Sequence, residues 1–372
     1  MSEVDIGKGK AGRRAYGLDE IAIVPSRRTR DPEDVDLSWE IDAFQFDLPV
    51  IASGMDGVVS PSTAIAFGRL GAVAALNLEG LWTRYEDPTP LLTEIAEAPD
   101  DTVNERLRQI YREPVKPELI LQRVKDIRSA GVISCGAVTP HRVEDLTEAI
   151  TAAELDLLVI QGTVVSAEHV TKGVDDPLNL KTFVRRLDLP VLVGGCSSYQ
   201  AALHLMRTGA AGILVGVGAG RSSSTRRVLG TGVAQATAIA DARAARMRHL
   251  DETGVYVHVI ADGGMATGGD IAKAIVCGAD AVMLGAPFAA AIDAPGRGHH
   301  WGLAAAHPTL PRGSRVTVGT RGTLEQILTG PASDDRGDLN LMGALRRAMA
   351  LCGHATLKEL QKADLVVTGR WT

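Results

Sequence analysis

Aromatic residues are scarce in this 372-residue chain, at 4% of positions, and the net charge of −6 shows no excess of positive charge. Few aromatic side chains leave little surface for base stacking, and an acidic chain lacks the basic face that binds a phosphate backbone. No apolar run reaches the length of a membrane-spanning helix. The composition therefore predicts a protein that binds neither nucleic acid nor a membrane.

Cysteine is also sparse, with four residues at 135, 196, 277 and 352 and no CxxC spacing. This usage is typical of neither a disulfide framework nor a structural zinc site, so we expect no metal. The first 14 residues are polar and contain no apolar signal core. These features predict a cytoplasmic protein with reduced thiols.

Short apolar runs recur along the chain, and most precede a helical pattern. Eight of them are rich in Val, Ile and Leu and do not alternate with polar residues, at 48–53, 72–77, 132–137, 156–162, 190–195, 212–218, 256–264 and 280–285. Such runs are typical of parallel strands that are buried on both faces. Eight β–α units in one chain predict a single-domain (β/α)8 TIM barrel over residues 1–372.

Two segments do not follow the barrel pattern. Residues 80–125 are charged and helix-prone, and they predict a helical excursion between the second and third strands. Residues 293–338 are rich in Gly and Pro and predict a flap-like segment after the last strand. Both are candidates for a lid or for contacts between subunits.

The stretch GVGAGRSSSTR, residues 216–226, follows the sixth predicted strand. In a TIM barrel, glycine loops after late strands bind phosphate through backbone N–H groups. Its GxGxG spacing also fits a dinucleotide fingerprint, but the strand with an acidic tip that this requires is replaced by a helical run. A glycine turn with a solvated Arg/Ser surface is the third interpretation. Asp262, before Gly263 and Gly264, suits either a ribose diol or a helix cap.

Several motifs occur in a fixed order, at 18–25 (LDEIAIVP), 53–56 (SGMD), 216–226, 228–242, 260–275, 278–288 and 341–353. Over nearly the whole chain these motifs resemble the IMP dehydrogenase/GMP reductase family. Members with inserted CBS modules carry them after the second strand, where residues 80–125 are too short for such an insertion. Without CBS modules, the chain resembles in layout either the GMP reductases or the short dehydrogenase-related paralogues of actinobacteria and cyanobacteria.

The resemblance implies a purine mononucleotide, either IMP/XMP or GMP/IMP, with NAD or NADP against its base. The implied nucleotide-binding residues are Ser53, Met55, Gly218, Gly220, Arg221, Ser222, Asp262, Gly263, Gly264, Gly285 and Ala286. The implied nicotinamide-binding residues are Gln161, Gly162 and Thr163. A monovalent cation at the 216–223 loop and a homotetramer are implied as well.

The main departure from the family is Ser223, which stands where the catalytic cysteine belongs. A serine hydroxyl needs an adjacent base to become a useful nucleophile, and the loop itself holds no His, Asp or Glu. Arg221 replaces a small phosphate-contacting residue, so it either pairs with the phosphate or fills its site. Cys135 and Cys196, expected at strand ends on the active face, are the candidate substitutes for the missing thiol.

Three functions follow from this departure. The first is an active purine-nucleotide oxidoreductase that uses an unconventional residue. The second is a catalytically silent paralogue that senses purine nucleotides or assembles with an active relative. The third is an oxidoreductase acting on another phosphorylated ligand.

A second departure lies in the flap region. The sequence contains no match to the family's Arg–Tyr flap pair, and GRGHHWG (296–302) occupies that region.

Overall fold

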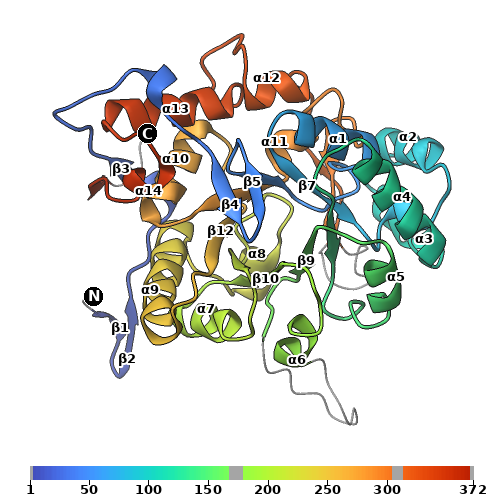
Figure 1. Ribbon diagram of the computed structural model, residues 1–372, viewed down its shortest axis with the longest axis horizontal. Helices are drawn as coiled ribbons and strands as arrows, with labels where there is room; N and C mark the ends of the chain where they lie inside the picture. The colour runs from blue at the N-terminus through green and yellow to red at the C-terminus, as the bar shows by residue number, and fades with distance from the viewer. Residues whose placement is uncertain (1–2, 167–178, 304–312, 369–372) are drawn as a thin grey trace.

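The computed structural model describes residues 3–166, 179–303 and 313–368 of the chain. Eight parallel strands form a closed barrel in the order β10-β11-β12-β13-β6-β7-β8-β9 (Figure 1). The strands are β6 (Val50–Ala52), β7 (Val73–Asn77), β8 (Cys135–Val138), β9 (Leu157–Gln161), β10 (Val191–Cys196), β11 (Gly212–Val215), β12 (His258–Asp262) and β13 (Ala281–Leu284). Six lie within the predicted runs and two, β8 and β10, extend one residue past theirs, so the predicted TIM barrel is confirmed.

The barrel strands are buried along almost their whole length, as the non-alternating apolar runs predicted. Glycines with positive φ precede five of them, at positions 71, 131, 209, 254 and 278. A residue with a Cβ rarely adopts these dihedral angles, so glycine at these positions ends a helix and turns the chain into the sheet.

Helices surround the barrel (Figure 1). They are α1 (Pro61–Arg69), α4 (Pro117–Ser129), α5 (Thr147–Ala152), α6 (Leu180–Val184), α7 (Tyr199–Met206), α9 (Gln235–Thr253), α10 (Gly268–Cys277) and α13 (Leu341–Leu351), with the short α8 (Thr225–Leu229), α11 (Ala286–Ala289), α12 (Leu324–Leu328) and α14 (Leu357–Leu360). Within the described part of the chain, no helix combines the length and apolar character needed to cross a membrane.

The segment between β7 and β8 contains α2 (Thr89–Glu97) and α3 (Val103–Ile110) as well as α4. Side chains from it form a second hydrophobic cluster with Trp301, which belongs to the segment after β13. That later segment carries the two-stranded pair β14 (His299–His300) and β15 (Val316–Thr317). Residues 304–312 of the predicted flap-like segment lie outside the described residues. The two irregular segments of the sequence therefore pack against each other.

The hairpin of β4 (Trp39–Ile41) and β5 (Phe44–Phe46) packs near the amino ends of the barrel strands. Trp39 stacks on Phe46, contacts the ring of His258 edge-on and donates a hydrogen bond to the Leu48 carbonyl. His258 is the first residue of β12, so the hairpin packs at the amino end of that strand. The remaining pairs are β1 (Glu3–Gly7) with β2 (Lys10–Arg13) and β3 (Ile21–Ile23) with β16 (Leu365–Val367).

Candidate functional site

The carboxyl ends of the barrel strands carry most of the residues implied by the sequence. Gln161 ends β9 and Asp262 ends β12, while Ser53, Gly216 and Gly285 directly follow β6, β11 and β13. In TIM barrels the active site lies at this end. Closure of the barrel therefore gathers residues that are more than 200 positions apart in the sequence.

The turn at Asp262–Gly264 packs directly on the loop after β11. A Cβ added to Gly263 would lie 2.8 Å from both Cα and N of Gly220, and one added to Gly264 would lie 3.4 Å from the Ala219 Cβ. Both glycines have positive φ, at 72° and 80°. Only backbone without side chains can approach this closely, so the two glycine motifs form one continuous surface.

We predict that Gly263→Ala lowers the free energy of unfolding by about 1–3 kcal/mol, because alanine is strained at positive φ and collides with backbone. Gly220→Ala is the matched control. An added Cβ there meets nothing within 4 Å, so its effect should stay within about 0.5 kcal/mol. Urea denaturation of the two variants measures the difference, and equal stabilities would contradict the described packing.

The loop after β6 lies against the end of β13. The Ser53 N–H donates to the Leu284 carbonyl at 2.8 Å. A Cβ added to Gly285 would lie 3.1 Å from the Met55 Sδ and 3.7 Å from the Ser53 Cβ. The structure thus brings Ser53, Met55 and Gly285 together, with Ala286 opening the short helix α11 directly behind them.

Gln161 links the implied cofactor loop to the implied ribose carboxylate. Its Nε2 donates to the Asp262 Oδ2 at 2.8 Å, although β10 and β11 separate β9 from β12 in the barrel. The next residue, Gly162, donates its N–H to the Gly194 carbonyl at 2.8 Å and Thr163 follows beside β10. Burial raises the pKa of Asp262 to about 6, and the Gln161 hydrogen bond opposes this rise.

Ser223 lies in an exposed turn that leads into α8. Its Oγ donates to the Thr225 Oγ1 at 3.1 Å and accepts from the Thr225 N–H at 3.3 Å, while its own N–H donates to the Gly220 carbonyl. These contacts are those of a local turn residue, and no described acid or base accepts its proton. The hydroxyl is therefore not set up as an activated nucleophile.

Arg226 fixes the shape of the same loop. Its Nε donates to the Val217 carbonyl at 3.1 Å and its Nη2 to the Val233 carbonyl at 2.5 Å. Gly218, at φ 70°, lies against it, since an added Cβ would be 2.6 Å from the Arg226 Cγ. Arg221 and Ser222 follow Gly220 at the tip, where Arg221 is exposed. The loop is thus held at its base by Arg226, while Arg221 at its tip is exposed.

The two candidate substitute thiols differ in position. Cys196 ends β10, on the predicted face, but burial raises its pKa to about 12. The prediction that Cys135 lies on this face is wrong. It is the first residue of β8 and pairs with Leu157, the first residue of β9, so it lies at the opposite end of the barrel. Burial also raises the pKa of Cys135, so neither thiol ionises readily at neutral pH.

Sequence reasoning missed a buried network that joins the segment after β13 to the barrel mouth. Trp301 Nε1 donates to the Tyr111 hydroxyl at 2.7 Å, which in turn donates to Asp56. Asn77 Nδ2 donates to the Leu303 carbonyl at 3.0 Å and to the Asp56 Oδ2 at 3.2 Å. No short motif signals this network, because its members come from four distant parts of the chain.

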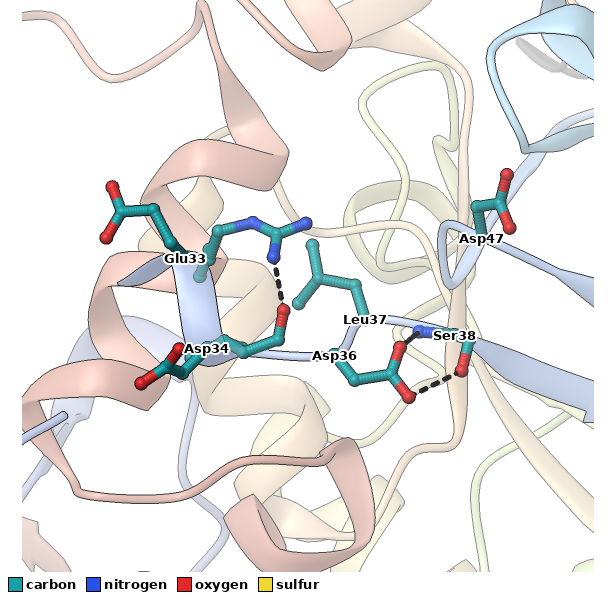
Figure 2. Close-up of a pocket in the computed structure, with 8 residues that line it drawn as sticks. Glu33, Asp34, Asp36, Leu37, Ser38 and Asp47 are labelled. Atoms are coloured by element: carbon teal, nitrogen blue, oxygen red, sulfur yellow. Dashed lines mark hydrogen bonds between the residues drawn. The ribbon is translucent and has the colours of Figure 1, made fainter. Parts of the chain in front are cut away.

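A hollow in the described surface lies elsewhere (Figure 2). It has a volume of about 390 Å³, and half of its lining is acidic, with Glu33, Asp34, Val35, Asp36, Leu37, Ser38, Asp47 and Arg346. Asp36 accepts hydrogen bonds from the Ser38 N–H and hydroxyl, while Arg346 donates to the Val35 carbonyl (Figure 2). Asp47 lies between β5 and the start of β6, so this hollow lies near the amino ends of the strands, away from the glycine loops.

Comparison with known proteins gives consistent results. Residues 15–302 match the model of the IMP dehydrogenase / GMP reductase domain. Proteins named as uncharacterized oxidoreductases in Mycolicibacterium smegmatis and Mycobacterium leprae are each 50% identical over 98% of this chain, covering 99% and 100% of their own lengths. An IMP dehydrogenase/GMP reductase-like protein from Corynebacterium glutamicum has a crystal structure with a TM-score of 0.92, 44% identity and 98% coverage of both chains.

An inosine-5'-monophosphate dehydrogenase of Haemophilus influenzae is 32% identical over 68% of this chain and 52% of its own length. One from Methanocaldococcus jannaschii is 24% identical over 95% of this chain and 93% of its own length. The similarity to proteins with that printed name is thus lower than the similarity to the mycobacterial oxidoreductases.

Proposed function

Because the chain belongs to the IMP dehydrogenase/GMP reductase family, we propose that it binds a purine mononucleotide, IMP/XMP or GMP/IMP, at the mouth of the barrel. The observation that carries this proposal is the close packing of the Asp262–Gly264 turn on the loop at 216–220. This packing leaves the backbone of the two glycine motifs exposed next to Gly285, and exposed backbone N–H groups of this kind bind phosphate.

The residues divide into two groups in this proposal. The nucleotide phosphate lies on Gly218, Gly220, Arg221, Ser222, Gly264, Gly285 and Ala286, with Gly263 shaping the turn and Ser53 and Met55 under the base. Asp262 accepts the ribose hydroxyls, because an ionised carboxylate is an acceptor alone. Its pKa of about 6 leaves it mostly ionised at neutral pH.

NAD or NADP is the proposed second ligand, beside Gln161, Gly162 and Thr163. A nicotinamide accepts or delivers a hydride when it is bound. Gln161 would orient Asp262 through the hydrogen bond described above and so connect the two ligand positions. A monovalent cation at the 216–223 loop finds no support in the described residues and is not proposed.

A second candidate function is a catalytically silent protein that binds purine nucleotides as a sensor or as a partner of an active relative. The local hydrogen bonds of Ser223 favour it, because they leave the loop without an activated nucleophile. A homotetramer and a cytoplasmic location complete the proposal. The location is supported by four free, buried cysteines, a usage typical of reducing compartments.

We predict that IMP, GMP or XMP binds to the protein in calorimetry, and that NAD(P)H absorbance changes slowly or not at all in the same mixtures. Binding with turnover identifies an oxidoreductase, and binding without turnover identifies the silent form. A protein that binds none of these nucleotides would contradict the proposal and favour another phosphorylated ligand.

Gly220→Ala is the variant that locates the nucleotide in this assay. Its added methyl group points into open space in the described structure, so the fold is kept while the proposed phosphate position is partly filled. Weaker nucleotide binding at unchanged stability would therefore assign the binding to this loop.

A further inference from the structure

The carboxylate of Asp56 is fully buried in the loop after β6, one residue beyond Met55. It accepts hydrogen bonds from the Leu81 N–H at 3.1 Å and from the Asn77 Nδ2 at 3.2 Å, and the Tyr111 hydroxyl also donates to it. Leu81 and Tyr111 belong to the segment between β7 and β8. A buried carboxylate is stable only among such donors. The donors of this segment therefore fix the position of Asp56.

The segment after β13 covers the same loop. The Gly296 N–H donates to the Gly57 carbonyl at 3.0 Å. A Cβ added to Gly57 would lie 3.3 Å from the Trp301 Cζ3, and one added to Gly54 would lie 3.4 Å from the Leu303 Cδ1. The loop after β6 is thus held between two segments that are far apart in the sequence.

One hydroxyl group joins these two segments. The Trp301 Nε1 donates to the Tyr111 hydroxyl at 2.7 Å, and that hydroxyl uses its single proton in the hydrogen bond to Asp56. Trp301 is 1% exposed and Tyr111 is 8% exposed. Solvent therefore does not replace a lost partner, and removal of one group leaves its neighbours unpaired. The position of Asp56 depends on both segments through this hydroxyl.

Met55 connects this hydrogen-bonded network to the end of β13. A Cβ added to Gly285 would lie 3.1 Å from both the Met55 Sδ and its Cε. The Met55 carbonyl accepts hydrogen bonds from the N–H groups of Val58 and Val59, at 2.8 Å and 2.9 Å. The residues on both sides of Asp56 thus belong to one compact turn, so a shift of Asp56 moves Met55 as well.

We propose that Tyr111 and Trp301 are positioning residues for the purine base, because they set the position of Met55 through Asp56. This inference rests on the proposed function, in which Met55 lies under the base and the phosphate lies on the glycine loops. The base and the phosphate are then held by different parts of the protein. Loss of the Tyr111 hydroxyl should therefore weaken the contacts with the base and leave those with the phosphate unchanged.

Tyr111→Phe removes this hydroxyl and keeps the aromatic ring. We expect its affinity for IMP in calorimetry to fall roughly 10-fold, which corresponds to the loss of one buried hydrogen bond. Its affinity for ribose 5-phosphate, which contains the ribose and the phosphate but no base, should not change. In the free protein, amide hydrogen exchange at residues 55–59 should become roughly 10-fold faster, because the turn loses one of its attachments.

Tyr85→Phe is the matched control. It removes a hydroxyl from the same segment, but this hydroxyl donates to the Ile110 carbonyl at 2.8 Å rather than to Asp56. The variant should bind IMP and ribose 5-phosphate as the wild type does and keep the slow exchange of residues 55–59. A general loosening of the segment would instead affect both tyrosine variants alike.

Trp301→Phe is the second variant, because it removes the indole N–H and leaves the hydrogen bond from Tyr111 to Asp56 in place. We expect it to weaken IMP binding roughly 3-fold, again with no effect on ribose 5-phosphate. The double variant should bind IMP no more weakly than Tyr111→Phe alone, since both changes act through one hydroxyl. If Tyr111→Phe does not fold, Trp301→Phe carries the same test.

Unchanged IMP affinity in Tyr111→Phe, or an equal loss for IMP and ribose 5-phosphate, overturns this inference and leaves the nucleotide site standing. Unchanged exchange at residues 55–59, or a Tyr85→Phe variant that behaves like Tyr111→Phe, overturns it as well. Additive effects in the double variant overturn the role of Trp301. A wild-type protein that binds none of IMP, GMP and XMP overturns both this inference and the proposed function.

Discussion

Ser223→Cys is expected to raise the rate of NAD-dependent IMP oxidation by roughly 100-fold or more. A general base that activates a nucleophile usually contributes at least about 100-fold to the rate, and the native serine has no such base. The exposed turn at 223 permits a thiol to ionise, because burial does not penalise the thiolate there as it does at Cys196. NADH absorbance measures the rate, and mass spectrometry of the quenched reaction detects the covalent nucleotide adduct.

Ser222→Cys is the control, since it places the same thiol one position away on the same loop. It should form no adduct, and its rate of NAD reduction should not rise above that of the wild type. If Ser223→Cys binds IMP but neither forms an adduct nor reduces NAD, the purine ring of the bound nucleotide does not lie within reach of position 223. The implied match between Ser223 and the family's cysteine would then be wrong.

Asp280→Ala is expected to destabilise the protein by about 3–5 kcal/mol, which is typical when one partner of a buried ion pair is removed. The Asp280 carboxylate, buried at the start of the β13 segment, accepts hydrogen bonds from Arg246 Nη1 at 2.7 Å, from the Tyr256 hydroxyl at 2.8 Å and from the Val259 N–H at 2.8 Å. Lys358 also contacts it. Its loss would leave the Arg246 guanidinium, which is 2% exposed, as a buried charge without its carboxylate.

Urea denaturation at neutral pH measures this effect. Glu252→Gln is the control, because Glu252 pairs with Arg207 and Arg248 at the surface and should change the stability little. Burial raises the pKa of Asp280, but the charges of Arg246, Lys358 and His258 outweigh it, so the net shift is downward. Its stabilisation is therefore present above pH 4 or so and is lost as the pH falls through the lowered pKa. Equal stability of wild type and Asp280→Ala at neutral pH would contradict the described network.

Local sequence patterns predicted the barrel well because each β–α unit carries its own signal. The run at 72–77 is buried as β7, and Gly71 before it has the positive φ expected of a helix end. The two candidate cysteines show where the same reasoning stops. Cys196 ends its strand as expected, whereas Cys135 begins one, because an apolar run does not show which of its residues are paired in the sheet.

The sequence by itself determined the eight-stranded barrel, the order of the glycine loops and the absence of a thiol at position 223. These features depend on residues close together in the chain, where hydrophobic periodicity and glycine conformation act. The tertiary structure decided the contact of Gly263 with Gly220 and the hydrogen bonds from Gln161 to Asp262 and from Trp301 to Tyr111. These pairs are 43 to 190 residues apart. Their proximity follows from closure of the barrel and from packing of the segment after β13, which no local pattern encodes.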